Sequence, residues 1–236
     1  MTGNTKTGMT EHSQTGATRT TPRRCRIAVL ISGSGSNLQA FIDAVAGKRL
    51  DADIVCVISN RADAFGLERA QRADIPTEVL DHKTFASRET FDAALQQRID
   101  AYTPDLVVLA GFMRILTDSF VRNYHGRLLN IHPSLLPKYP GLNTHQRAID
   151  AGDREAGATV HFVTEELDGG SAIVQARVPI IAGDDAASLA QRVLEKEHAI
   201  YPLAAQWFAE GRLRLEGRHA LLDGAVLLPS GDDYRQ

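Results

Sequence analysis

From residue 25 onward, short apolar runs alternate along the chain with amphipathic stretches. Three of these runs are continuous rather than alternating: residues 26–31, 54–58 and 106–110. Continuous apolar runs are typical of parallel strands that are covered on both faces. The stretches between them predict helices over residues 36–46, 64–72 and 88–101. This alternation predicts an α/β fold built on a doubly wound, mostly parallel, Rossmann-like sheet.

The alternation of continuous apolar runs with amphipathic stretches becomes less regular after residue 150. Residues 158–164 and 172–180 alternate between apolar and polar positions, which predicts antiparallel strands added toward the C-terminus. A helix is predicted over residues 186–208 and a terminal hairpin over residues 212–228. Since no linker-like composition interrupts the chain, we expect residues 25–236 to form one domain. Residues 1–24 are rich in Thr and Gly, which predicts a disordered N-terminal tail.

Composition narrows the class of protein. The chain is 43% hydrophobic and 23% charged with a formal net charge of −3, which is ordinary for a folded protein and argues against a broad basic surface for nucleic acid. The two cysteines show no metal-ligand or disulfide spacing. No stretch has the pattern of a secretory signal or the length of a membrane span. We therefore expect a cytoplasmic protein without membrane or nucleic-acid partners.

The loop after the first predicted strand is rich in Gly and Ser. It opens like a dinucleotide-binding fingerprint, but Leu38 stands where the third Gly should be, and the second strand ends in Ser59-Asn60 without the acid that holds a ribose. An NAD site is therefore disfavoured. A loop of this kind at a helix start suits a single phosphate, and a tight turn without a ligand explains it equally well.

The predicted strand around residue 130 ends with two polar side chains on one face. Asn130 and His132 are two residues apart, and Pro133 should end the strand. The amide can donate to a developing oxyanion and the imidazole can carry a proton. No Ser or Cys lies in a nucleophile-elbow pattern, which indicates that the attacking group belongs to the substrate.

Three further features have both structural and functional explanations. Phe112 and Met113 follow a strand and suit either a pocket wall or core packing. The acidic loop 164–170 would usually be a solvated turn, but one of its carboxylates, folded over His132, would favour a charged imidazole. Glu197 lies in an apolar helical stripe and needs a salt-bridge partner or a ligand hydroxyl. The remaining histidines show no metal-ligand spacing, so no metal is expected.

Together these motifs resemble the phosphoribosylglycinamide formyltransferase family of folate-dependent enzymes. The similarity covers residues 26 to about 228 in order. The motifs that carry it are Ser32-Gly33-Ser34-Gly35-Ser36-Asn37-Leu38, Ala62-Asp63-Ala64-Phe65-Gly66-Leu67-Glu68-Arg69-Ala70, Leu109-Ala110-Gly111-Phe112-Met113-Arg114-Ile115-Leu116, Leu129-Asn130-Ile131-His132-Pro133-Ser134-Leu135-Leu136-Pro137, Leu167-Asp168-Gly169-Gly170 and Glu197-His198-Ala199-Ile200-Tyr201-Pro202. The chain departs from many relatives in having Ser34 for Asn and Asn143 for His.

The resemblance implies transfer of a formyl group from 10-formyltetrahydrofolate to the amine of glycinamide ribonucleotide, in purine biosynthesis and without a metal. It implies that Asn130, His132 and Asp168 are catalytic and that the N-terminal half binds phosphate while the C-terminal half binds folate. The implied ribonucleotide-binding residues are Gly35, Ser36, Asn37 and Glu197. The implied folate-binding residues are Arg88, Met113, Arg114, Ile115, Leu116, Thr164, Glu165, Glu166, Leu167 and Asp168.

From the sequence alone, two alternative functions remain open. Formyltetrahydrofolate deformylase and methionyl-tRNA formyltransferase share the Asn-x-His-Pro motif, but each usually carries an extra domain with no counterpart in this sequence. A nucleotide-binding module without catalysis would leave Asn130, His132 and Asp168 unexplained. Partners are expected to be the two small substrates, and a homodimer is compatible with the sequence.

Overall fold

The computed structural model describes residues 1–2 and 23–235, and it contains one large sheet and one small sheet. The large sheet has eight strands in the order β11-β7-β6-β5-β4-β1-β2-β3. Its strands are β1 (Cys25–Ile31), β2 (Ala52–Ser59), β3 (Thr77–Val79), β4 (Leu106–Leu109), β5 (Leu128–His132), β6 (Glu155–Phe162), β7 (Ala172–Pro179) and β11 (Asp232–Asp233). The tail expected over residues 1–24 lies mostly outside the described residues, since residues 3–22 are not described.

Strand directions confirm the predicted fold class. Strands β1 to β5 pair in parallel, whereas β6 runs antiparallel to both β5 and β7. The two-residue strand β11 then pairs in parallel with β7. Instead of one terminal hairpin, the last predicted segment forms a three-stranded sheet of β8 (Leu213–Glu216), β9 (His219–Leu222) and β10 (Ala225–Val226). The sheet is therefore parallel at one end and antiparallel at the other.

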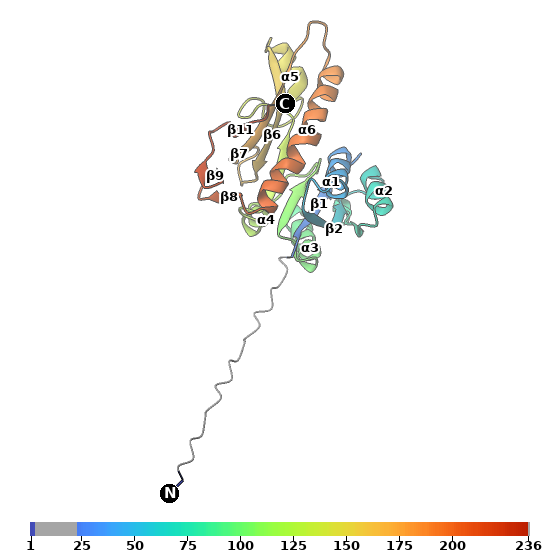
Figure 1. Cartoon of the computed structure of the whole chain (residues 1–236). Coiled ribbons are helices and arrows are strands. Elements are labelled where there is room, and N and C mark those ends of the chain that lie inside the picture. Colours follow the sequence, from blue (N-terminus) through green and yellow to red (C-terminus); the bar gives the residue numbers. More distant parts are fainter. Residues whose placement is uncertain (3–22, 236) are drawn as a thin grey trace.

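Helices cover both faces of the large sheet (Figure 1). They are α1 (Ser36–Ala46), α2 (Phe65–Arg72), α3 (Arg88–Ala101), α4 (Asp118–Asn123), α5 (Thr144–Asp150) and α6 (Ala186–Ala209), with a short 3-10 turn at His82–Thr84. Ile27, Val29 and Ile31 of β1 pack on the face of α1 and α6, whereas Ala28 and Leu30 pack on the face of α3 and α4. This alternation explains why the strand is continuously apolar.

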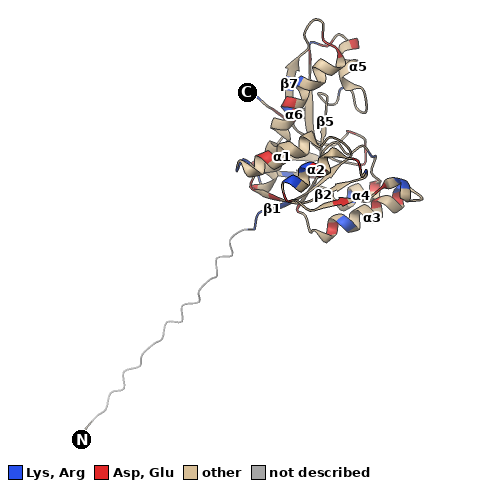
Figure 2. Ribbon diagram, turned by 90° about the vertical axis from the view of Figure 1, so that its right-hand side faces the viewer, with Lys and Arg blue, Asp and Glu red and all other residues tan. Residues whose placement is uncertain are grey.

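The first strand is also fixed at the end where it begins. Arg23 pairs with Asp105, and Arg24 pairs with Asp51 and Asp53. Charges of both signs also occur along α3 (Figure 2).

The two cysteines lie in β1 and β2, where burial raises the pKa of the Cys25 thiol to about 11 and that of Cys56 to about 12.

The carboxyl ends of β1, β2, β4 and β5 open toward one edge of the sheet. The order β4-β1-β2 places the change of chain direction between β1 and β4, because the strands after β1 first extend to one side and then to the other. Ligands of open α/β sheets bind at such a point. Tyr201 of α6, which is fully buried, places its hydroxyl 3.0 Å from the Leu109 carbonyl and 2.9 Å from the Leu129 carbonyl, so α6 is joined to β4 and β5 at this edge.

The loop from residue 32 to 37 packs backbone against backbone on α2. Gly35 has φ +68°, and a Cβ there would lie 2.5 Å from Gly66 Cα. The Gly66 amide donates to the Gly33 carbonyl at 3.0 Å. A Cβ on Gly66 would lie 2.6 Å from Ile31 Cδ1. The close approach therefore requires glycine at both positions.

We expect Gly66→Ala to destabilise the protein by about 1–3 kcal/mol, because overpacking outweighs the usual gain from replacing a helical glycine. Urea unfolding measures this change. Gly33→Ala is the matched control, since no atom lies within 4 Å of the added Cβ. Equal stability of the two variants would show that α2 moves aside without cost.

Candidate active site

Both ring nitrogens of His132 face a fixed partner. The residue ends β5, and Nε2 lies 2.8 Å from the Tyr139 carbonyl oxygen. Because a carbonyl only accepts, Nε2 carries the hydrogen. Nδ1 lies 3.4 Å from Asp168 Oδ2, and the two side chains are each 7% exposed. The Asp168 carboxylate is thus the group that faces Nδ1.

Asp168 is held in place by the loop on which it lies. Its backbone has φ +52°, and Oδ2 accepts the Gly141 amide hydrogen at 2.9 Å. A Cβ on Gly170 would lie 1.7 Å from the Phe162 carbonyl oxygen, so only glycine lets the loop close against β6. Of the three acids in this loop, Asp168 is therefore the one that reaches His132.

Asn130 is oriented by a histidine that sequence reasoning missed. The residue that pairs with Asn130 across β5 and β6 is His161, whose Nε2 lies 3.2 Å from Asn130 Nδ2. His161 Nδ1 lies 3.0 Å from the Phe162 carbonyl, so Nδ1 carries the hydrogen and Nε2 accepts from Asn130. Burial lowers the pKa of His161 to about 4, and the ring is neutral near pH 7. One amide hydrogen of Asn130 is thus committed, and the second can serve a substrate.

These polar residues share one face of the antiparallel part of the sheet. Asn130 pairs with His161 and His132 pairs with Thr159, while the alternating residues Leu129 and Ile131 pack into the core on the other face. The only sequence signal for His161 was its place in an alternating strand. Its partner could be found only from the register of β5 against β6.

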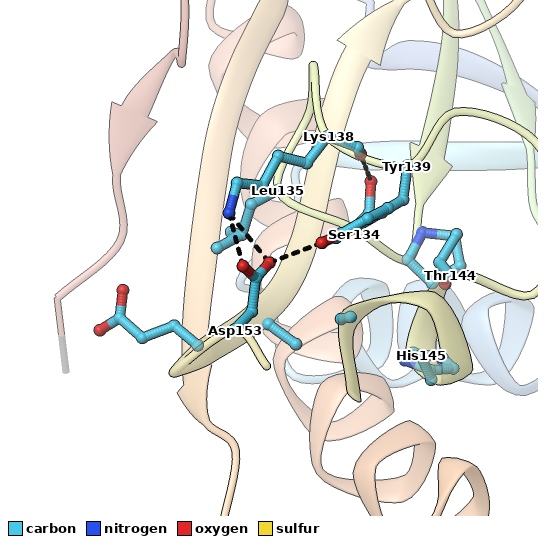
Figure 3. Close-up of a pocket in the computed structure, with 11 residues that line it drawn as sticks. Ser134, Leu135, Lys138, Tyr139, Thr144, His145 and Asp153 are labelled. Carbon is cyan, nitrogen blue, oxygen red and sulfur yellow. Dashed lines mark hydrogen bonds and ion pairs between the residues drawn. The ribbon is translucent and has the colours of Figure 1, made fainter. Parts of the chain in front are cut away.

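The loop after β5 is anchored to Asp153 (Figure 3). Tyr139 has φ +56°, and its hydroxyl donates to Asp153 at 2.9 Å. Figure 3 shows Lys138 and Tyr139 directed toward Asp153, and Lys138 lies 2.9 Å from this carboxylate. The adjacent cavity, which His145 also lines, has about 10 Å³, close to the space that one water needs. The cavity is therefore too small for a substrate, and its polar side chains hold the Tyr139 carbonyl against His132.

The Gly- and Ser-rich loop contacts Glu197. Asn37 Nδ2 donates to Glu197 Oε2 at 2.8 Å, and Asn37 Oδ1 is buried without a partner among the described residues. Burial raises the pKa of Glu197, and the hydrogen bond from Asn37 opposes that rise. Gly35 is the N-cap of α1 and Ser36 its first residue. The site thus combines helix amides with a buried carboxylate.

The predicted folate-contacting residues lie in two loops and at the start of α3. Met113 and Ile115 are exposed, and the Arg114 guanidinium lies 5.4 Å from the centre of the Phe91 ring. Arg88 is the first residue of α3. Leu116 packs against the core. This segment therefore presents apolar side chains to solvent beside the carboxyl end of β4.

The second predicted folate loop, residues 164–168, carries exposed groups as well. Leu167 is exposed, Thr164 donates to the Glu166 carbonyl at 3.4 Å, and Glu165 lies 3.5 Å from Arg122.

Within residues 1–2 and 23–235, no group of three or more His, Cys, Asp or Glu side chains could hold a metal ion. No helix in that part of the chain is long and apolar enough to cross a membrane.

Comparisons with known proteins identify the family. The chain belongs to the formyl transferase family, whose model matches residues 25–205. Within that family it is similar to phosphoribosylglycinamide formyltransferases. It is 58% identical to the Escherichia coli enzyme over 87% of this chain and 97% of the relative. The structure of the Coxiella burnetii enzyme in complex with CHES superposes with a TM-score of 0.87 at 53% identity, covering 90% of this chain and all of that one.

A longer relative contains the same unit. The trifunctional purine biosynthetic protein adenosine-3 of Drosophila melanogaster is 54% identical over 80% of this chain, which corresponds to 14% of the relative.

The low pKa of His161 makes stability depend on pH. At pH values between the folded-state pKa of about 4 and the ordinary pKa of 6.5, His161 binds a proton in the unfolded chain but not in the folded chain. The free energy of unfolding therefore falls as pH drops through this window. His161→Gln removes this contribution and keeps an acceptor for Asn130. We expect its Tm to fall less than that of the wild type between about pH 7 and pH 4.

Thermal melts across this range at constant ionic strength measure the difference. A parallel decline of both proteins would show that His161 does not titrate as its burial requires.

Proposed function

We propose that the protein transfers the formyl group of 10-formyltetrahydrofolate to the amine of glycinamide ribonucleotide, giving N-formylglycinamide ribonucleotide and tetrahydrofolate in purine biosynthesis. A bond forms between the amine nitrogen and the formyl carbon, the bond from that carbon to folate N10 breaks, and one amine proton moves to N10. The observation that carries this proposal is the convergence of Asn130 and His132, at the end of β5, with Asp168 from the loop after β6.

The proposed chemistry needs position and charge rather than a protein nucleophile. The free amide hydrogen of Asn130 donates to the oxyanion of the tetrahedral intermediate, and the polar imidazole of His132 stabilises the developing charge. In the described conformation the Nε2 hydrogen of His132 is donated to Tyr139. A direct hydrogen bond from Nε2 to the oxyanion therefore requires the Tyr139 carbonyl to move aside when substrate binds.

Asp168 orients the His132 ring through its contact with Nδ1, and it assists the proton transfer from the amine to N10 through water. No metal takes part in this scheme.

The ribonucleotide occupies the loop at α1 and the carboxylate beside it. Backbone amides of Gly35 and Asn37 and the hydroxyl of Ser36 hold the phosphate at the helix start. Glu197 and the unpartnered Asn37 Oδ1 accept hydrogen bonds from ribose hydroxyls. A buried acceptor without a partner is costly, and a sugar hydroxyl supplies the missing donor.

The folate occupies the remaining side of the site. Its ring lies against the segment Met113, Arg114, Ile115 and Leu116 and against the loop Thr164, Glu165, Glu166, Leu167 and Asp168, and Arg88 pairs with its carboxylate. Residues 25–236 then act as one domain: its N-terminal half carries the phosphate-binding loop, and its C-terminal half adds the folate-binding loop of residues 164–168. A cytoplasmic location, a homodimer, and the absence of nucleic-acid and membrane partners remain predictions for fractionation and sedimentation experiments.

A spectrophotometric assay for the folate product tests the function directly. Turnover should require both 10-formyltetrahydrofolate and glycinamide ribonucleotide. Equal turnover without the ribonucleotide would indicate a deformylase, and no turnover with it would indicate a binding module.

His132→Ala and Asn130→Ala should each lower kcat by about 10²-fold or more while the fold survives, because each removes charge or hydrogen bonding from the transition state. Circular dichroism and thermal melting check the fold. Near wild-type turnover of either folded variant would reject its catalytic assignment.

Glu197→Gln should raise the KM for glycinamide ribonucleotide about tenfold and leave the folate KM unchanged, because one acceptor for the ribose loses its charge. Since burial raises the pKa of Glu197, the ionised group costs folding free energy at neutral pH, and this cost is lost as pH falls through the raised value. The variant should therefore be at least as stable as wild type at pH 7. Glu195→Gln, an exposed change on the same helix, is the control. Equal KM values for Glu197→Gln and wild type would remove Glu197 from the binding site.

A further inference from the structure

The segment of residues 110–117 has no helix or strand structure, although it follows a buried strand. Ala110 donates to the Leu30 carbonyl, and α4 begins after Thr117. Phe112 is buried while Met113 and Ile115 are exposed, so the backbone must hold a defined shape for these side chains to alternate. Regular backbone hydrogen bonds do not supply that shape.

Two buried side chains from other elements bind the backbone of this segment. Ser32, which follows β1, accepts the Met113 amide hydrogen on Oγ at 2.8 Å. Asp92 of α3 accepts the Thr117 amide hydrogen on Oδ2 at 2.6 Å. In the described part of the chain, these are the two amides of residues 111–117 that donate to side chains. They lie at the two ends of the run from Met113 to Leu116.

Each of these acceptors is itself held in one orientation. The Ser32 hydroxyl donates to Asn60 Oδ1 at 2.6 Å, so its lone pairs are directed toward Met113. Asn60 Nδ2 lies 3.2 Å from His82 Nδ1, which extends the contact to the turn before α3. Both Ser32 and Asn60 are buried. The hydroxyl therefore has little freedom to choose another partner.

Asp92 is a buried carboxylate whose second oxygen, Oδ1, has no partner among the described residues. Burial raises its pKa, and the Thr117 amide, Arg88 and Arg114 oppose that rise. A buried carboxylate costs folding free energy unless its oxygens accept hydrogen bonds. The contact that it makes is the one that fixes the end of the exposed segment.

We propose that Ser32 and Asp92 are positioning residues for the formyl-folate: they clamp the backbone on either side of Met113–Leu116, so that this segment forms a preformed wall. This inference rests on the proposed function for its ligand and on the two hydrogen bonds for its geometry. Neither side chain needs to touch the substrate. Loss of either clamp leaves the apolar segment in place but lets it adopt other shapes, which lowers affinity for the folate.

The test uses the full chain and two readouts. Ser32→Ala and Asp92→Ala should each speed amide hydrogen exchange of residues 110–117 by about tenfold, because a hydrogen bond to a buried acceptor is lost. The KM for 10-formyltetrahydrofolate should rise by about 5–20-fold, while the KM for glycinamide ribonucleotide changes less than about twofold. Asp92→Asn keeps an acceptor for Thr117 and should restore most of both values.

Asp105→Ala is the matched control, because Asp105 also accepts a backbone amide, that of Arg26 at 2.9 Å, but at the opposite end of β1. It should leave exchange at residues 110–117 and both KM values near wild type. If Asp92→Ala does not fold, Ser32→Ala decides the clamp by itself, through the same two readouts.

The outcomes separate the two proposals. Unchanged exchange at residues 110–117 in Ser32→Ala would overturn the clamp. Faster exchange with an unchanged folate KM, or with equal changes in both KM values, would overturn its role in folate binding. A wild-type protein without formyl transfer would instead refute the proposed function, and the exchange measurement would still decide the clamp.

Discussion

The imidazole of His132 is fixed between a backbone carbonyl and a carboxylate, and the rest of the site is built around this arrangement. Two loops far apart in sequence must converge for it to exist. One brings the Tyr139 carbonyl to Nε2, and the other brings Asp168 to Nδ1. The direct hydrogen bond from the Gly141 amide to Asp168 joins these loops to each other. A change in the conformation of either loop therefore alters the contacts of the His132 imidazole.

The strand that follows β5 departs from the parallel half of the sheet for a physical reason. A parallel neighbour of β5 would need a crossover helix over the face that carries Asn130 and His132. The antiparallel β6 follows instead, and its own polar residues Thr159 and His161 lie on that same face. Loops rather than a helix cover it. The result is a polar surface inside an otherwise apolar sheet.

Much of the fold was accessible from sequence because buried parallel strands have a strong local signature. The run at residues 26–31 predicted β1, and the two-residue spacing of Asn130 and His132 predicted a shared face. The shorter elements β3, α4, α5 and β11 were missed. Asp232–Asp233 becomes a strand only because its backbone pairs with β7, and no local pattern encodes that contact.

The site could be predicted only in part from the sequence, because its contacts join residues that are distant along the chain. Local pattern left open which acid of residues 164–168 meets His132, since that depends on how Gly170 lets the loop close. The partner of Asn130, His161, depends on strand register, and the Tyr139 carbonyl depends on a left-handed backbone conformation. The Asn37 contact with Glu197 joins residues 160 positions apart. Such contacts are tertiary, and a single sequence does not show them without a known relative.

The raised thiol pKa values of the two cysteines have a practical consequence for labelling. A thiol reacts as its thiolate, and burial keeps Cys25 and Cys56 protonated far above neutral pH. A cysteine introduced at the exposed Leu142 or Leu167 would therefore react with maleimide reagents much faster than either native thiol. Fluorophores or spin labels can be attached to the two loops that enclose His132 without first removing the natural cysteines.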